Sequence, residues 1–212
     1  MTAMFNQALD GYLDAHATPL EALLQENYEE TYASLSSAQM IAGPVVGRLL
    51  RLLVAMAAPR LVVEIGTFTG YSALAMAGGL PPEGRIVTCE LSPERAAFAQ
   101  GYFDRSPWRD RIDVRVGPAL DTVNALDGPF DFVFIDADKD GYPGYYDAVV
   151  PKLSPRGLIA VDNTLSGGDV VDPVDERDRV MAAFNDHVQA DERTENVLLS
   201  VRDGVSLIRL AS

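Results

Sequence analysis

The chain has 212 residues, a formal net charge of −14 at pH 7, and a composition that is 48% hydrophobic and 23% charged. This balance is typical of a globular protein, and we expect residues 1–212 to form one domain, with helices in 1–40 and an α/β core in 41–212. The acidic charge argues against nucleic acid and anionic membranes as partners. Because we find neither a secretory signal nor an apolar run of about 20 residues, we expect a cytoplasmic protein.

Cysteine and histidine are scarce in this sequence. Cys89 is the one cysteine, so an internal disulfide is impossible, and its place in the apolar run RIVTC predicts a buried strand thiol. The two histidines, His16 and His187, are too few for the usual serine-hydrolase and zinc-hydrolase sites. The composition therefore argues against both classes of hydrolase.

The first 60 residues show the apolar spacing of helices. Apolar side chains in 9–13 and 20–28 predict two helices, and the stretch VVGRLLRLLVAMAA predicts a third. Pro44 falls in the first turn of this third helix and Pro59 just beyond its end, which are positions where proline is tolerated.

From Leu61 onward, short β-branched runs alternate with helical segments. Because the strands are nearly all apolar, this alternation predicts a doubly wound α/β domain with a parallel sheet covered on both faces. The runs VLLSV and VSLIRL flank Asp203-Gly204, a hairpin signal, and predict an antiparallel pair at one edge. The parallel strands are expected at 61–65, 85–89, 111–116, 130–135 and 157–161, and the helices near 70–79, 92–104, 118–126, 142–153 and 176–190.

The segment VVEIGTFTGYS indicates a ligand site. Gly66 and Gly70 allow a ligand to approach the backbone at a helix N-terminus, but their spacing is not the Gly-x-Gly-x-x-Gly of dinucleotide folds. Glu90 ends the second strand, where a carboxylate can accept hydrogen bonds from ribose hydroxyls. Glu64 would repel a phosphate and attract a cationic ligand such as S-adenosylmethionine. These residues favour a nucleoside site over an ordinary turn.

Oxygen-bearing side chains follow two further strands. The run FDFVFI leads into DADKD, and GLIAV leads into Asp162 and Asn163. The carboxyl ends of adjacent parallel strands lie about 5 Å apart, so Asp136, Asp162 and Asn163 could converge on one ion. Two carboxylates and an amide select a hard cation such as Mg²⁺ or Ca²⁺. On spacing alone, Asp136 could instead cap a helix, and Asp162 and Asn163 could form a turn.

In this order, the segments VVEIGTFTGYSALAMA, CELSPERAAFA, GPALDTV, FDFVFIDADKDGYPGYY and GLIAVDNTLSGGDVVDP resemble the cation-dependent O-methyltransferases of the catechol and caffeoyl-CoA type. The resemblance runs from about Met40 to the last strand, VSLIRL. It implies a Rossmann-like fold, S-adenosylmethionine as methyl donor, a divalent cation (Mg²⁺ before Ca²⁺ or Mn²⁺) and a small aromatic substrate with vicinal hydroxyls. It also implies a homodimer, as is common among bacterial relatives.

The resemblance carries roles onto single residues. Lys139 matches the catalytic base that removes a proton from a phenolic hydroxyl; from its position alone, it could equally form a surface salt bridge with Asp136 or Asp140. The matching metal ligands are Asp136, Asp162 and Asn163. The matching donor contacts are Ala42, Glu64, Gly66, Thr67, Ser72, Glu90, Ala119 and Asp138.

Some positions depart from the family pattern. Gly141, Ser166 and Gly167 stand where relatives often have Asn, Trp and Asn, so the acceptor pocket differs from that of the plant enzymes and acyl-CoA substrates stay an open question.

Two alternatives to an O-methyltransferase also remain. An NAD-dependent oxidoreductase would need a glycine where Phe68 stands, and a non-catalytic S-adenosylmethionine-binding module would have no use for Lys139.

Overall fold

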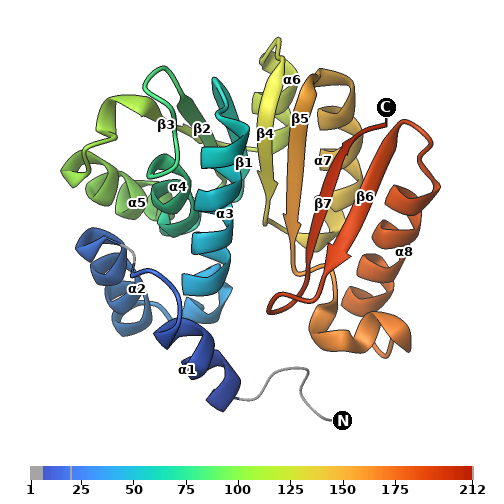
Figure 1. The fold of residues 1–212 in the computed structure, drawn as a ribbon, viewed down its shortest axis with the longest axis horizontal. Coiled ribbons are helices and arrows are strands. Elements are labelled where there is room, and N and C mark those ends of the chain that lie inside the picture. Colours follow the sequence, from blue (N-terminus) through green and yellow to red (C-terminus); the bar gives the residue numbers. More distant parts are fainter. Residues whose placement is uncertain (1–6, 20, 212) are drawn as a thin grey trace.

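A computed structural model describes residues 7–19 and 21–211 (Figure 1). A seven-stranded sheet lies between two layers of helices, with α3, α4 and α5 on one face and α6, α7 and α8 on the other. The predicted extent of one domain over 1–212, and the part of the second helix that falls on Leu20, include residues outside the described ranges.

The sheet has the order β3-β2-β1-β4-β5-β7-β6. The first five strands are parallel, and β7 runs antiparallel between β5 and β6, so the doubly wound fold with an antiparallel edge pair is confirmed. The strands are β1 Leu61–Ile65, β2 Arg85–Glu90, β3 Ile112–Val116, β4 Phe130–Ile135, β5 Leu153–Asp162, β6 Thr194–Leu199 and β7 Val205–Leu210.

The helices follow the predicted order. Pro44 lies in the first turn of α3 and Pro59 just after its end, as predicted, and Ser92 Oγ caps α5 by accepting the Arg95 N–H at 3.3 Å. The α-helices are α1 Gln7–Ala15, α2 Ala22–Ser34, α3 Gly43–Ala57, α4 Tyr71–Ala77, α5 Pro93–Arg105, α6 Ala119–Ala125, α7 Tyr142–Val149 and α8 Glu176–Ala190. Short 3₁₀ turns are η1 Ala38–Met40, η2 Arg109–Arg111, η3 Lys139–Gly141, η4 Val150–Lys152 and η5 Ser166–Val171.

Three boundaries differ from the prediction. Helix α7 ends at Val149 rather than near 153, because Pro151 falls in the separate turn η4. Strand β5 begins at Leu153 rather than 157, since Leu153 pairs with Phe130 across an irregularity in the register. Strand β6 begins at Thr194, three residues before the predicted VLLSV run. In the two strands, tertiary pairing sets the start of the element.

Alternate strand residues face the two helix layers. Val62 and Phe132 point into the layer of α3 to α5, whereas Val63 and Val133 point into the layer of α6 to α8. All four are fully buried, and burying a side chain of this size contributes roughly 1.5–3 kcal/mol. The two cores hold the strand ends at fixed positions relative to one another.

Within the described residues, one helical stretch, Ala38–Ala57, has the length and mean hydropathy of a membrane-crossing helix. The prediction that no run reaches this length was therefore wrong by that criterion. The inner face of α3, with Val46, Leu50 and Val54, is completely buried in the core, as in a helix of a folded domain. Length and composition alone do not distinguish a membrane-crossing helix from a buried helix of a folded domain.

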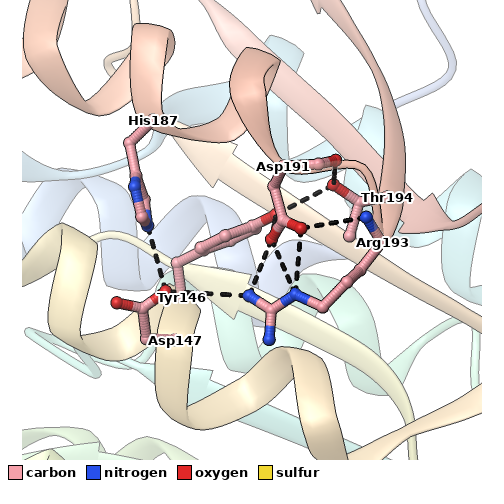
Figure 2. A network of polar contacts seen from close by, with 6 residues as sticks. All are labelled: Tyr146, Asp147, His187, Asp191, Arg193 and Thr194. Carbon is pink, nitrogen blue, oxygen red and sulfur yellow. Dashed lines mark hydrogen bonds and ion pairs between the residues drawn. The ribbon is translucent and has the colours of Figure 1, made fainter.

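A polar network fastens α7 to the segment between α8 and β6 (Figure 2). The Tyr146 hydroxyl donates to Asp191 Oδ2 at 2.8 Å and lies 2.8 Å from Thr194 Oγ1. Arg193 Nη2 lies 2.7 Å from Asp191 Oδ2, and its guanidinium holds the pKa of Asp191 well below its ordinary range. The network anchors α7, whose first residue, Tyr142, belongs to the site described next.

Candidate active site

The site lies where the strand order reverses, because successive strands are added outward from β1 and β4 to opposite edges. The turn between β6 and β7 lies at the same end of the sheet as the arrowheads of β4 and β5 (Figure 1). A cleft of about 440 Å³ opens there. Its lining residues are Gln39, Met40, Ile41, Phe68, Asp136, Ala137, Asp138, Lys139, Asp162, Asn163, Arg177, Arg202 and Asp203.

A second, much narrower hollow adjoins the cleft at Asp136, which lines both. Its lining includes Ala42, Gly66, Thr67 and Ser72, four of the predicted donor contacts. The structure therefore brings these four residues together and sets them beside the predicted metal ligands.

Gly66, which lines the narrow hollow, lies against the backbone of Asp136. Its φ is +105°, and a Cβ at this position would lie 2.1 Å from the backbone oxygen of Asp136. The Asp136 N–H donates to Ile65 O at 2.9 Å. Only glycine allows the tip of β1 to touch the tip of β4 in this way. The approach of a ligand to the backbone at this turn stays a prediction.

Glu64 is fully buried beneath the glycine turn. Thr88 Oγ1 donates to Glu64 Oε2 at 2.5 Å, and Thr67 Oγ1 lies 2.5 Å from Thr88 Oγ1. Glu64 Oε1 is buried without a hydrogen-bond partner of ordinary geometry among the described residues. Burial raises the pKa of Glu64 to about 8, against the opposing effect of the Ser72 and Thr88 hydroxyls. An unpaired buried carboxylate oxygen fits a cationic ligand.

Glu64→Gln is expected to stabilise the free protein at alkaline pH and to weaken binding of a cationic donor. Since the folded pKa of about 8 exceeds the ordinary 4.5, the folded state holds more protons between these values, so the stability contributed by Glu64 falls as pH rises through that window. Glutamine has no such loss. Thermal unfolding from pH 5 to 9 should show a Tm difference in favour of the variant that grows to pH 8 and then levels off. A constant difference would contradict the buried charge.

Thr88 was not selected by sequence reasoning. It lies directly opposite Glu64 in the register of β1 and β2 and positions the carboxylate by its hydrogen bond. Its position two residues before Glu90 could have identified it, because alternate strand residues share a face. The pairing with Glu64 itself depends on the register, which the sequence does not state.

Glu90 is held at the end of β2 by two backbone N–H groups. Its Oε2 accepts from Phe68 N at 2.8 Å and its Oε1 accepts from Ser92 N at 2.9 Å, which leaves further lone pairs for a ligand. The large apolar side chains of Leu91 and Val116, at the ends of β2 and β3, are 71% and 56% exposed. Sequence reasoning missed both; for Leu91, its place directly after the apolar run of β2 was the available signal.

The narrow hollow is not lined by four of the predicted donor contacts, Glu64, Glu90, Ala119 and Asp138. Ala119 begins α6 and packs against the α6–α8 core, and it does not line either hollow. Asp138 lines the cleft and accepts a hydrogen bond from the Tyr145 hydroxyl at 2.6 Å. Their roles toward a donor stay predictions.

Two of the three predicted metal ligands contact one ammonium group, and the third contacts one of those two ligands. Lys139 Nζ donates to Asn163 Oδ1 at 2.5 Å and lies 3.3 Å from Asp136 Oδ1. Asp162 Oδ1 accepts the Asn163 N–H at 2.8 Å. The side chains of Lys139 and Asp136 are only 15% and 16% exposed, so their ion pair is not a surface salt bridge.

The charge of Lys139 alone does not balance the carboxylates of this cluster. Burial and, after it, the neighbouring Asp136 raise the pKa of Asp162 to about 7. Burial also raises the pKa of Asp136, partly offset by Lys139. One ammonium cannot neutralise two buried carboxylates, so the oxygen set of Asp136, Asp162 and Asn163 fits a hard divalent cation. In the described part of the chain no three His, Cys, Asp or Glu residues form a metal-binding group, so the amide of Asn163 is needed as the third ligand.

Tyr142 is a further site residue that sequence reasoning missed. It is fully buried, its hydroxyl donates to Asp162 O at 3.2 Å, and it also accepts a hydrogen bond from Lys139 Nζ. The ammonium lies 4.5 Å from the centre of the Tyr142 ring. Tyr142 therefore sets the direction of Lys139, and its place three residues after Lys139 was the available signal.

The glycine at 141 has a local cause. A Cβ there would lie 2.5 Å from Tyr145 Cε2 and 2.7 Å from Asp138 Oδ2. The contact between Tyr145 and Asp138 thus requires glycine where relatives often have Asn. Ser166 also differs from the family pattern. Its Oγ donates to Asp178 Oδ1 at 2.7 Å and so joins the capping box of α8.

Comparison with known proteins identifies the family. Residues 14–211 match the family described as O-methyltransferase. The chain belongs to this O-methyltransferase family. The predicted family and the predicted enzyme class, an S-adenosylmethionine-dependent O-methyltransferase, are confirmed.

Relatives of this O-methyltransferase include plant and bacterial proteins. It is 35% identical to caffeoyl-CoA O-methyltransferase 2 of Zea mays, covering 93% of this chain and 80% of that protein. It is 44% identical to catechol O-methyltransferase of Mycobacterium tuberculosis over 138 residues, covering 64% and 62%. The structure of the O-methyltransferase from Bacillus cereus in complex with SAH superposes with a TM-score of 0.85 at 32% identity, covering 96% and 97%.

The family assignment argues against the NAD-dependent oxidoreductase alternative. At the glycine turn, Phe68 occupies the place of the second dinucleotide glycine with a φ of +49°, and its ring lies 5.2 Å from the Arg95 guanidinium carbon. A bulky side chain at this point prevents the close approach that a pyrophosphate needs.

Proposed function

We propose that this O-methyltransferase methylates one hydroxyl of a small aromatic compound with vicinal hydroxyls, using a divalent cation, Mg²⁺ first. The observation that carries the proposal is the meeting of Asp136, Asp162 and Asn163 with Lys139 in one cleft, next to the hollow at Gly66. Oxygen ligands from two strand ends and a lysine within reach of the same atoms are the groups that this reaction requires.

The narrow hollow supports an assignment of donor contacts. We assign Glu64 and Ser72 to the ammonium end of S-adenosylmethionine, because Ser72 lines the hollow and Glu64 Oε1, buried behind it, has no hydrogen-bond partner of ordinary geometry among the described residues. Ala42, Gly66 and Thr67 would line this end, and Glu90 would accept the ribose hydroxyls. Leu91 and Val116 offer apolar surface for the adenine, with Ala119 and Asp138 as the remaining expected contacts.

The chemistry divides between the cation and the protein. A bound divalent cation lowers the pKa of a phenolic hydroxyl and orients the diol. Lys139, directed by Tyr142, would accept the hydroxyl proton at Nζ as a neutral amine, the form that the charge of a bound cation nearby favours. The oxygen then forms a bond to the methyl carbon while the carbon–sulfur bond breaks, leaving S-adenosylhomocysteine. The fixed strand ends hold the reacting groups close and aligned, which supplies much of the rate gain.

Methylation of a catechol panel tests this function. With S-adenosylmethionine and Mg²⁺, mass spectrometry should detect monomethylated products, and a chelator should remove the activity until Mg²⁺ is restored. Activity that persists in chelator would contradict the metal assignment. Donor binding without any methylation of the panel would favour the non-catalytic binding module.

We also propose that the enzyme acts as a cytoplasmic homodimer without nucleic acid or membrane partners. Exposed apolar side chains on the N-terminal helices support a protein contact there, since Tyr32, Leu52 and Met56 are 49%, 63% and 80% exposed. Light scattering would test this, because a monomer mass at micromolar concentration would contradict it.

A further inference from the structure

The cleft holds two arginines that the proposed reaction does not use. Arg177 comes from the first turn of α8, and Arg202 from the turn between β6 and β7. Once a divalent cation is bound by Asp136 and Asp162, the lining carboxylates that remain are Asp138 and Asp203. Lys139 has to be a neutral amine when it acts as the base, so these two carboxylates face the two arginines. Asp203 lies 3.7 Å from Arg177 and also accepts the Gly167 N–H, so Arg177 is incompletely paired and can bind a further anion.

Arg177 is available to a ligand. Within the described residues Arg177 has one ion pair, from Nη2 to Asp203 Oδ2; it is 3.7 Å long, which is too far for a hydrogen bond. Asp203 also accepts the Gly167 N–H through Oδ1. The Arg177 side chain is 56% exposed, so it stands at the mouth of the cleft rather than at its inner wall. A ligand could pair with it without breaking a hydrogen bond.

Arg202 is held in place. Its Nη1 donates to the backbone oxygens of Ile41 and Ala42, which ties the β6–β7 turn to the start of α3. For its Nε and Nη2 groups, the structure gives no hydrogen-bond partner within residues 7–19 and 21–211. Arg202 thus presents a fixed positive charge from the side of the sheet edge, while Arg177 presents a movable one from α8.

The positions of Arg177 and Arg202 indicate which substituent the aromatic ring of the acceptor carries. A diol has to lie at the inner wall, where Lys139 and Asn163 lie, so a group on the other side of the ring points to the mouth. The planar fork of an arginine matches a carboxylate with two parallel hydrogen bonds. A protein of net charge −14 repels small anions, so local arginines are needed to bind one.

Resting on the proposed function, we infer that the preferred acceptor is an aromatic diol that carries a carboxylate, bound at the mouth of the cleft by Arg177 with support from Arg202. Arg177 is then a specificity-determining residue for the methyl acceptor. Its contribution is ionic and partly exposed, so it weakens as salt is added.

A matched pair of compounds tests the inference. Calorimetry would measure binding of 3,4-dihydroxybenzoate and 3,4-dihydroxybenzamide to the protein with Mg²⁺ and S-adenosylhomocysteine, and kcat/KM would be measured for both. At low salt we expect the carboxylate to be favoured about 10-fold in both measurements, and the preference to shrink at high salt. In Arg177→Gln the ratio should fall to near one. Arg179→Gln is the control, because Arg179 lies on the same helix, pairs with Glu176 and does not line the cleft.

Equal binding of the two compounds by the unaltered protein would overturn the inference. An equal loss of affinity for both compounds in Arg177→Gln would also overturn it. Methylation of neither compound would refute the proposed function instead. Because binding is measured separately from turnover, the carboxylate preference would still be decided in that case.

Discussion

Asp162→Ala is expected to abolish metal-dependent methyl transfer, lowering kcat/KM by about 1000-fold or more. Asp162 ends β5, is 2% exposed and supplies one of three oxygen ligands, so its loss removes a charge that nothing nearby replaces. A bound cation contributes several kcal/mol to such a reaction, and each 1.36 kcal/mol is tenfold in rate. The affinity for S-adenosylmethionine, measured by calorimetry, should change by less than about twofold, since Asp162 does not line the donor hollow.

Two variants control this result. Asp140→Ala removes an exposed carboxylate from the same charged segment and should leave activity within about twofold, as is usual for surface changes. Glu90→Ala should show the reverse pattern, with weakened donor binding and intact metal binding. More than a tenth of the normal activity in Asp162→Ala would rule out Asp162 as a metal ligand.

Lys139→Ala is expected to reduce kcat by about 10²- to 10⁴-fold, the usual contribution of a general base. Lys139 Nζ is the group that reaches both Asn163 Oδ1 and Asp136 Oδ1, where the acceptor hydroxyl has to lie. Single-turnover methylation at saturating donor and metal would measure this loss.

Metal affinity separates the base role from a supporting one. The ammonium of Lys139 competes with a cation for Asp136 and Asn163, so Lys139→Ala should bind Mg²⁺ as tightly as the unaltered enzyme or more tightly. Full activity in this variant would remove Lys139 from the base role, and loss of Mg²⁺ binding would make it a structural support. Lys152 is the only other lysine and donates to the carbonyls of residues 123, 124 and 126, so Lys152→Ala should affect stability rather than chemistry.

The sequence placed the strand ends correctly, because apolar strands in β-α alternation leave few possible topologies. Once β1 and β4 are neighbours, Gly66 and Asp136 have to meet, and Asp162 with Asn163 lies one strand further. This is why residues 70 and more positions apart in the sequence could be assigned to one site.

Other site residues depend on register and packing, which the sequence does not state. Thr88 supports Glu64 only because the two are paired across β1 and β2, and Tyr142 orients Lys139 only because α7 continues directly from η3. Arg177 reaches the cleft from α8, far along the chain, and no motif marks it. Such contacts follow from tertiary structure.

Diffraction from crystals soaked with Mn²⁺ would test most directly whether the two strand ends bind a cation. The account predicts one anomalous peak within roughly 2.5 Å of oxygen atoms of Asp136, Asp162 and Asn163, with Lys139 Nζ displaced from them. A peak elsewhere, or Asp136 and Asn163 still bonded to Lys139 at saturating Mn²⁺, would contradict it.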